Sequence, residues 1–164
     1  MSRHSWPRFG IVVVMQLHTI VNGNCKEVCM YPNLLGLQIL ILDDQLAQSA
    51  FGVDCFLTRL GGTVHTATTV DAAISCIKAQ PEAQMFHAVV IDYQINGSRP
   101  GTDFALWLWS HQSPATTQIR RICYSGTQKS AIQLAIPALA MFDAIIENGT
   151  VVALQELCTS LCPC

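Results

Sequence analysis

Two hydrophobic patterns alternate along most of this chain. Short apolar runs occupy residues 37–43 (LQILILD), 63–67, 87–92, 119–125 and 143–147. Runs of this length with few polar interruptions are typical of strands buried on both faces of a sheet. The sequence therefore predicts five strands, of which the fourth is weakened by Arg120 and Arg121.

Between these runs, apolar residues recur every three or four positions, which is the pattern of a helix with one buried face. Helices are predicted over 46–60, 70–80, 104–111, 131–140 and 151–161. Gly61 and Gly62 are expected to end the first helix, and Thr69 to cap the second. Strict alternation of strands and helices predicts a doubly wound α/β fold, with a five-stranded parallel sheet and helices on both faces.

Polar residues end four of the predicted strands: Asp43 with Asp44, Asp92, Ser125 and Glu147. Ligands of parallel α/β sheets bind at the carboxyl ends of the strands, so these side chains are expected to converge. Three carboxylates suit Mg²⁺, which takes few carboxylates and keeps several waters. A bound cation would leave one carboxylate oxygen able to attack a phosphoryl group, and the Ser125 hydroxyl would donate to that group once it is attached.

Several segments resemble response-regulator receiver domains of two-component signalling. ILILDD (39–44), VVIDYQI (89–95) and CYSG (123–126) resemble the first, third and fourth strands of that family. Gly101 and the segment ATTVDAAI (67–74) also match it. The resemblance covers residues 37–161 and implies a flavodoxin-like fold and a cytoplasmic protein. Residues 1–36 would form an N-terminal extension of uncertain structure, and 162–164 a C-terminal tail.

The resemblance also implies a role for each strand-end residue. Asp92 would accept a phosphoryl group from a histidine kinase or a phosphotransfer protein. Asp43 and Asp44 would hold Mg²⁺ together with Asp92 and the backbone carbonyl of Gln94. Ser125 would act as the switch residue that senses the phosphate. The expected function is a phosphorelay receiver and not a free-standing enzyme.

Two positions depart from the family pattern. Glu147 stands where receivers carry a lysine, and Ala144 where they carry an aromatic switch residue. Replacing the lysine by an acid removes an attraction to the phosphoryl group and adds a repulsion, on the order of several kcal/mol at close range. Glu147 either points to solvent or joins the aspartates, in which case the four carboxylates would raise one another's pKa values. Lys129 is a candidate substitute cation.

These departures favour an alternative function. The chain would then be a degenerate pseudo-receiver, a protein–protein interaction module that works without phosphorylation. A third hypothesis, a Mg²⁺-dependent phosphatase of the haloacid-dehalogenase type, requires the motif D-x-D-x-T. Here the acids are adjacent and are followed by Gln45 and Leu46, which disfavours that hypothesis.

Composition narrows the possible partners. Of the 164 residues, 51% are hydrophobic and 12% charged, so a packed core is expected rather than disorder. The formal net charge of −2, without a basic cluster, argues against direct binding of nucleic acid. The apolar segment 9–21 is shorter than the ~20 residues of a membrane span, so an added strand or helix is expected there and no membrane role.

Eight cysteines are present. Cys55, Cys76 and Cys123 fall in apolar segments and are expected to be buried side chains without a chemical role. Four others, in CKEVC (25–29) and near the C-terminus, are expected to lie near one another: Cys25, Cys29, Cys158 and Cys162. A zinc site, a disulfide and reduced thiols all remain open for them.

The chain is expected to act through protein partners. Few residues follow Glu147, so a single-domain regulator or a piece of a hybrid kinase is expected rather than a regulator with a DNA-binding output domain. The fourth helix carries more apolar residues than one inward face needs: Ile132, Leu134, Ile136 and Leu139. They predict a homodimer or a partner contact on the face formed by the fourth helix, fifth strand and fifth helix.

Overall fold

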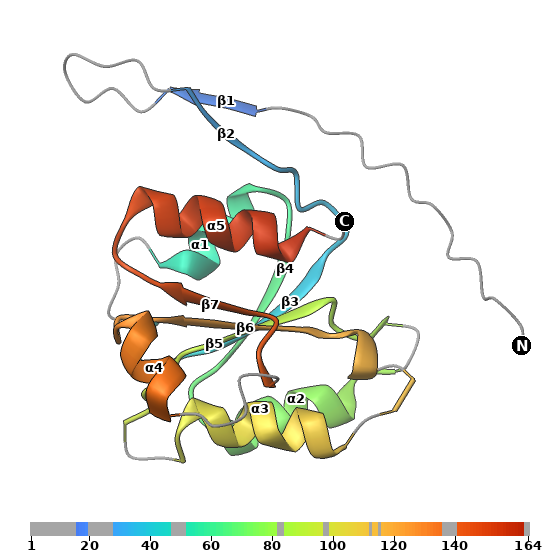
Figure 1. Ribbon diagram of the computed structural model, residues 1–164. Helices are drawn as coiled ribbons and strands as arrows, with labels where there is room; N and C mark the ends of the chain where they lie inside the picture. Colours follow the sequence, from blue (N-terminus) through green and yellow to red (C-terminus); the bar gives the residue numbers. More distant parts are fainter. Residues whose placement is uncertain are drawn as a thin grey trace, which may run out of the picture.

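The computed structural model describes residues 16–19, 28–46, 52–81, 84–96, 99–111, 113–114, 116–135 and 141–162. Its centre is a five-stranded parallel sheet with the strand order β4-β3-β5-β6-β7 (Figure 1). The strands are β3 (Gln38–Leu42), β4 (Thr63–Ala67), β5 (Ala88–Ile91), β6 (Arg120–Ser125) and β7 (Ala144–Glu147). All five predicted strands are confirmed, as is the doubly wound α/β fold.

Five helices cover the two faces of this sheet. One face carries α1 (Val53–Arg59) and α5 (Val151–Leu161), as Figure 1 shows. The other carries α2 (Val70–Ala79), α3 (Gly101–Ser110) and α4 (Lys129–Ala135). A short 3-10 helix, Thr116–Gln118, precedes β6. Each face therefore has its own hydrophobic core.

Strand β3 lies inside the sheet, between β4 and β5, and is apolar from Ile39 to Leu42. Leu40 and Leu42 pack into the core beneath α2 and α3, whereas Ile39 and Ile41 pack into the core beneath α1 and α5. Successive side chains of a strand point to opposite faces, and here both faces are covered. All four of these side chains are buried, which holds the end of β3 in a fixed place.

The two arginines of β6 do not weaken that strand, which is the longest of the five. Nη1 of Arg120 donates a 2.8 Å hydrogen bond to the carbonyl oxygen of Ser160, in the last turn of α5. Arg121 forms an ion pair with Asp143 and lies over the ring of Trp109, 5.3 Å from its centroid. The expectation of a weakened strand was wrong because both charged groups have partners at the sheet's amino end.

The first and fourth helices differ from their predicted ranges. Helix α1 begins at Val53, because Gly52 has an extended backbone, with φ −64° and ψ 155°. The predicted start at Leu46 was therefore wrong. The helix ends as expected at Gly61, whose φ of 94° is a left-handed conformation that favours glycine. The second half of the predicted fourth helix, with Pro137, lies outside the described residues.

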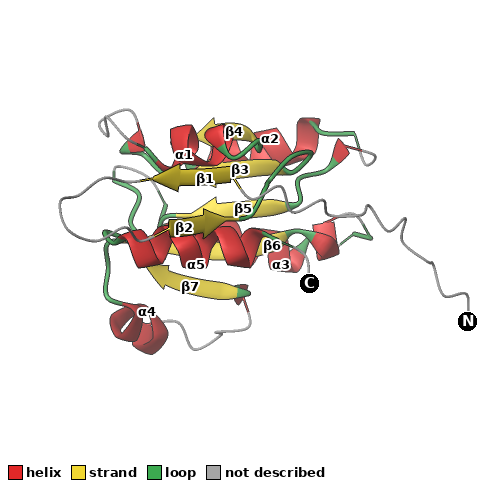
Figure 2. Cartoon of the chain, turned by 90° about the horizontal axis from the view of Figure 1, so that it is seen from above, coloured by secondary structure: helices red, strands yellow, loops and turns green. Residues whose placement is uncertain are grey.

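Two short strands lie in the N-terminal extension. β1 (Gln16–Thr19) and β2 (Val28–Tyr31) pair antiparallel and form a separate two-stranded sheet. Figures 1 and 2 place this pair on the side of the main sheet that α1 and α5 cover. An added strand was one of the two expectations for residues 9–21. None of the described helices is long and apolar enough to cross a membrane.

Gly101 brings the start of α3 against the end of β5. A Cβ atom at this position would overlap the carbonyl oxygen of Asp92 and lie 2.8 Å from Cγ2 of Ile91. The backbone N–H of Gly101 also donates a 3.3 Å hydrogen bond to the carbonyl of Tyr93. Only a residue without a side chain allows this approach, so Gly101 closes the loop that follows Asp92.

Replacing Gly101 by alanine should therefore destabilise the fold. We expect Gly101→Ala to lower the free energy of unfolding by about 2–3 kcal/mol, because backbone must move to admit the methyl group. Urea denaturation followed by tryptophan fluorescence measures the change. Gly126→Ala is the control, since its Cβ would meet only Oδ1 of Asn148, at 3.4 Å. Equal unfolding midpoints for the two variants would contradict the close approach.

Candidate functional site

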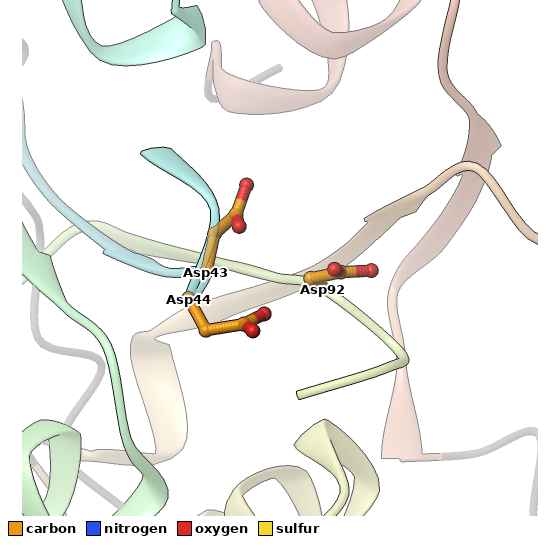
Figure 3. A group of neighbouring side chains, drawn as sticks. All are labelled: Asp43, Asp44 and Asp92. Atoms are coloured by element: carbon orange, nitrogen blue, oxygen red, sulfur yellow. The ribbon is translucent and has the colours of Figure 1, made fainter. Parts of the chain in front are cut away.

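Three aspartates lie together at the carboxyl ends of β3 and β5. Asp43 and Asp44 follow β3, and Asp92 follows β5. One carboxylate oxygen of each lies within 4.8 Å of the others (Figure 3). β3 and β5 are hydrogen-bonded neighbours at the point where the strand order reverses, which is the usual ligand-binding position of such sheets. The predicted convergence is confirmed for Asp43, Asp44 and Asp92, three of the five side chains for which it was expected.

Backbone amides hold one oxygen of two of these carboxylates. Oδ1 of Asp43 accepts a 2.7 Å hydrogen bond from the N–H of Gln45. Oδ1 of Asp92 accepts one of 3.3 Å from the N–H of Gln94. In both cases the donor lies two residues after the acid, so the turn itself orients the carboxylate. That the Gln94 carbonyl is a metal ligand stays a prediction.

Asp44 is held by a residue from the following loop. Its Oδ2 accepts hydrogen bonds from the backbone N–H of Asn96, at 3.2 Å, and from the Asn96 side-chain amide, at 3.0 Å. Its Oδ1 is buried and has no hydrogen-bond partner among the described residues. A buried oxygen without a partner costs about 1–3 kcal/mol. A cation between the three aspartates would satisfy it, so these residues fit a hard divalent ion.

Asn96 is the site residue that the sequence reasoning missed. It lies four positions after Asp92, in a loop of polar residues, and is itself exposed. The only signal in the sequence was an amide side chain close behind a strand-end acid. Nothing in a linear pattern shows that this amide returns to an acid on another strand.

Burial and mutual repulsion both act on Asp43. Its pKa lies above the ordinary aspartate value, first because of burial and then because of the negative charges of Asp92, Asp44 and Asp54. Within the part of the chain that the structure describes, no lysine or arginine forms an ion pair with the three site aspartates. The site is thus an acidic group without a protein counter-charge, and a bound cation would relieve the repulsion.

Ser125 lies at the end of β6, the strand next to β5. The side chain is 1% exposed, and its hydroxyl oxygen accepts a 3.3 Å hydrogen bond from the N–H of Thr127. Its expected place at the carboxyl edge of the sheet is confirmed. On the same strand, burial, followed by the charge of Asp92, raises the pKa of Cys123 to about 12. That thiol stays protonated at neutral pH.

Glu147 lies opposite Ser125 in the sheet but does not join the aspartates. The side chain is exposed, and Oε2 accepts a 3.4 Å hydrogen bond from the backbone N–H of Lys129, the first residue of α4. The alternative of four clustered carboxylates was therefore wrong. The donor in this contact is the backbone N–H of Lys129 and not its ammonium group. That the ammonium group takes the place of the lysine expected at position 147 stays a prediction.

The cysteines agree only in part with expectation. Cys123 is buried and Cys76 half-buried, but Cys55 is exposed, so the prediction of a buried side chain was wrong there. Cys55 lies on α1 away from the face that buries Leu57. Burial, followed by the neighbouring Cys162, raises the pKa of Cys158 to about 12. Cys25 lies outside the described residues, and so does the Cys29 side chain, which leaves the predicted zinc site or disulfide open.

The chain matches no protein-family model and no curated protein sequence. Solved structures do resemble it. The response regulator receiver domain (CheY-like) from Methylobacillus flagellatus superposes with a TM-score of 0.59 at 19% identity, over 76% of this chain and 98% of that one. A sensor protein from Polaromonas sp. JS666 gives 0.63 at 15% identity, over 77% and 93%.

A third similar structure is the response regulator protein TrrA from Thermotoga maritima in complex with Mg²⁺-BeF. Its TM-score is 0.59 at 15% identity, over 77% of this chain and 99% of that one. The chain has the receiver-domain fold. This receiver fold places the three aspartates where the sequence resemblance expected them, at the carboxyl ends of its first and third parallel strands.

Removing one negative charge should stabilise the ion-free receiver fold. The raised pKa of Asp43 means that the folded state binds a proton more tightly than the unfolded chain. Ionisation therefore lowers stability as the pH rises from about 4 through the folded-state pKa. We expect Asp43→Asn, which keeps an oxygen acceptor for Gln45, to raise the melting temperature at pH 7 and to reduce the difference between pH 4 and pH 7.

Addition of Mg²⁺ should make the wild type more stable than Asp43→Asn. Mg²⁺ at a hundredfold its Kd should stabilise the wild type by about 2.7 kcal/mol and Asp43→Asn by much less. Thermal melts at several pH values, with and without the ion, measure both effects. Glu156→Gln, on the exposed surface of α5, is the control that removes one negative charge outside the site. A lower melting temperature of ion-free Asp43→Asn at pH 7 would contradict the destabilisation of the ionised Asp43 by burial and by the neighbouring charges.

Proposed function

We propose that this chain is a phosphorelay receiver that accepts a phosphoryl group on Asp92. The observation that carries the proposal is the convergence of three aspartates with one buried oxygen, Oδ1 of Asp44, left without a partner. An acidic group so arranged needs a cation, and a carboxylate beside a cation can act as a nucleophile toward a phosphoryl group. The receiver fold supports the same proposal.

Each site residue would have a distinct part in the transfer. The oxygen of Asp92 that does not accept the Gln94 N–H would attack phosphorus. The P–O bond to Asp92 forms as the P–N bond of the donor's phosphohistidine breaks, and the leaving imidazole nitrogen takes the electron pair and a proton. Mg²⁺, held by Asp43, Asp44, Asp92 and the Gln94 carbonyl, would neutralise charge on the phosphoryl oxygens.

Ser125 would respond to the new group. Its hydroxyl oxygen is engaged only by the Thr127 N–H among the described contacts, so its proton is available to a phosphoryl oxygen. Turning that hydroxyl toward Asp92 would change the contact with Thr127, close to the start of α4. A charge added at Asp92 would thereby alter the surface around α4, which is the surface offered to a partner.

A histidine kinase or a phosphotransfer protein is the proposed phosphodonor. The homodimer through α4, β7 and α5 also remains a proposal. Of the residues behind it, Ile132 is buried in the core, and Ile136 and Leu139 lie outside the described residues. Val152 of α5 is an exposed apolar side chain, 71% exposed.

Phosphorylation of Asp92 is the direct test of the proposed function. Incubation with acetyl phosphate and Mg²⁺ should add one phosphate to the intact protein, as measured by mass spectrometry. Asp92→Asn should gain none, because an amide is not a nucleophile toward phosphorus. The loss of Mg²⁺ should also prevent the reaction. Unmodified wild type, under conditions in which the ion is bound, would rule out phosphotransfer and leave the second candidate function.

That second candidate is a receiver-like interaction module that works without phosphorylation. Glu147 favours it, because this acid lies beside Ser125 at the carboxyl edge and its carboxylate contacts the start of α4. The position thus adds a negative charge at the same edge of the sheet as Asp92. Cytoplasmic location and the absence of an enzymatic activity of its own also remain proposals.

The variant Glu147→Lys tests how much this charge matters. We expect phosphorylation by acetyl phosphate to become faster, by up to about tenfold, because a repulsion is replaced by an attraction that solvent partly screens. Glu156→Lys makes the same charge change on the exposed surface of α5 and should have little effect. If both variants react at the wild-type rate, Glu147 has no influence on the site, and the argument for degeneracy loses its support.

A further inference from the structure

Asp44 differs from the other two aspartates in how its oxygens are used. An ionised carboxylate oxygen has two lone pairs with which it accepts hydrogen bonds or binds a cation. Asn96 supplies two donors to Oδ2 of Asp44, so both lone pairs of that oxygen are occupied. Oδ1, which is buried, accepts none from the described residues. Asp44 is thereby prepared to bind a cation through one oxygen.

This restriction matters for the choice of cation. Mg²⁺ is small, requires near-octahedral geometry and binds few carboxylates while keeping several waters. Ca²⁺ takes six to eight oxygens and readily binds both oxygens of one carboxylate. A carboxylate that offers a single oxygen therefore suits Mg²⁺ and denies Ca²⁺ part of its coordination shell.

We propose that Asn96 is a positioning residue that makes Asp44 a one-oxygen ligand and so gives the site its preference for Mg²⁺ over Ca²⁺. The inference rests on the metal site of the proposed function. Asn96 differs from Gln45 and Gln94, which hold Asp43 and Asp92 through the backbone and would do so with almost any side chain. At Asp44 one of the two donors belongs to the side chain, so this preference is encoded in the identity of the residue.

Described residues on both sides of Asn96 have contacts of their own. Ile95, directly before it, is 7% exposed and packs into the core beneath α2 and α3. Arg99 forms an ion pair with Asp71 at the start of α2. Gly101 then returns the chain to the end of β5. The Asn96 amide thus contacts Asp44 directly after the buried residue Ile95.

Metal competition on the full chain tests this preference without any measurement of phosphorylation. Mn²⁺ binding is followed by electron paramagnetic resonance, and Mg²⁺ and Ca²⁺ are added as competitors. We expect Mg²⁺ to displace Mn²⁺ from the wild type at lower concentration than Ca²⁺ does. Asn96→Ala should weaken Mg²⁺ binding about tenfold, as the loss of a residue that orients a metal ligand commonly does. Ca²⁺ binding should weaken less or improve, so that the preference for Mg²⁺ over Ca²⁺ becomes smaller.

Asn33→Ala is the matched control. The Asn33 side chain is engaged too, but as an acceptor, since its Oδ1 accepts a 2.9 Å hydrogen bond from the backbone N–H of Leu35. Asn33 precedes β3 and so lies at the amino edge of the sheet. It should leave both Kd values unchanged. Melting curves without metal show any general loss of stability, whereas a change in the ratio of the Kd values reports the site itself.

The outcomes separate the two proposals. A wild type that binds no Mn²⁺ would remove the metal site and the proposed function together. A wild type that binds Mn²⁺, with Asn96→Ala showing the same ratio of Mg²⁺ to Ca²⁺ affinity, would overturn the role of Asn96 and leave the proposed function intact. Equal shifts in Asn96→Ala and Asn33→Ala would also overturn it, because the effect would then not arise at Asp44.

Discussion

The parallel pairing of β3 with β5 at the centre of the sheet is the constraint on which the site depends. Both strands are buried by helices on two faces, so their carboxyl ends are fixed next to each other. The acids that follow these strands therefore lie close together. The pKa of Asp43 is raised first by burial and then by the negative charges of the neighbouring acids. Hydrophobic burial of the strands stabilises this placement against electrostatic repulsion.

Hydrogen bonds orient each of the three carboxylates, although they repel one another. Each aspartate has one oxygen held by an N–H donor, and the opposite oxygen is left for a ligand. The donors come from the turns that follow the acids themselves, with the exception of Asp44, which takes both of its donors from the loop after β5. The site is therefore assembled before any ion arrives, and little rearrangement is needed on binding.

The next pair of strands, β6 and β7, carries the two positions on which the proposed functions differ. Ser125 at the end of β6 is buried, whereas Glu147 at the end of β7 is exposed and contacts the start of α4. Those two side chains lie opposite each other in the sheet register. Glu147 stands where the family resemblance predicts a lysine, and its carboxylate contacts the first residue of α4. The two proposed functions differ in whether a phosphoryl group on Asp92 is needed at this edge of the sheet.

The sequence by itself determined the order of the elements along the chain. These are five apolar runs, the helices between them and the acids that end the runs. These features are local, because periodicity and strand-end polarity are visible in short windows. Tertiary structure alone decided three other points. It gave Arg120 and Arg121 their partners, turned Glu147 away from the aspartates, and brought Asn96 onto Asp44. Each of these is a contact between residues far apart in the chain or a choice of side-chain direction, and neither is encoded in a local pattern of hydrophobic and polar positions.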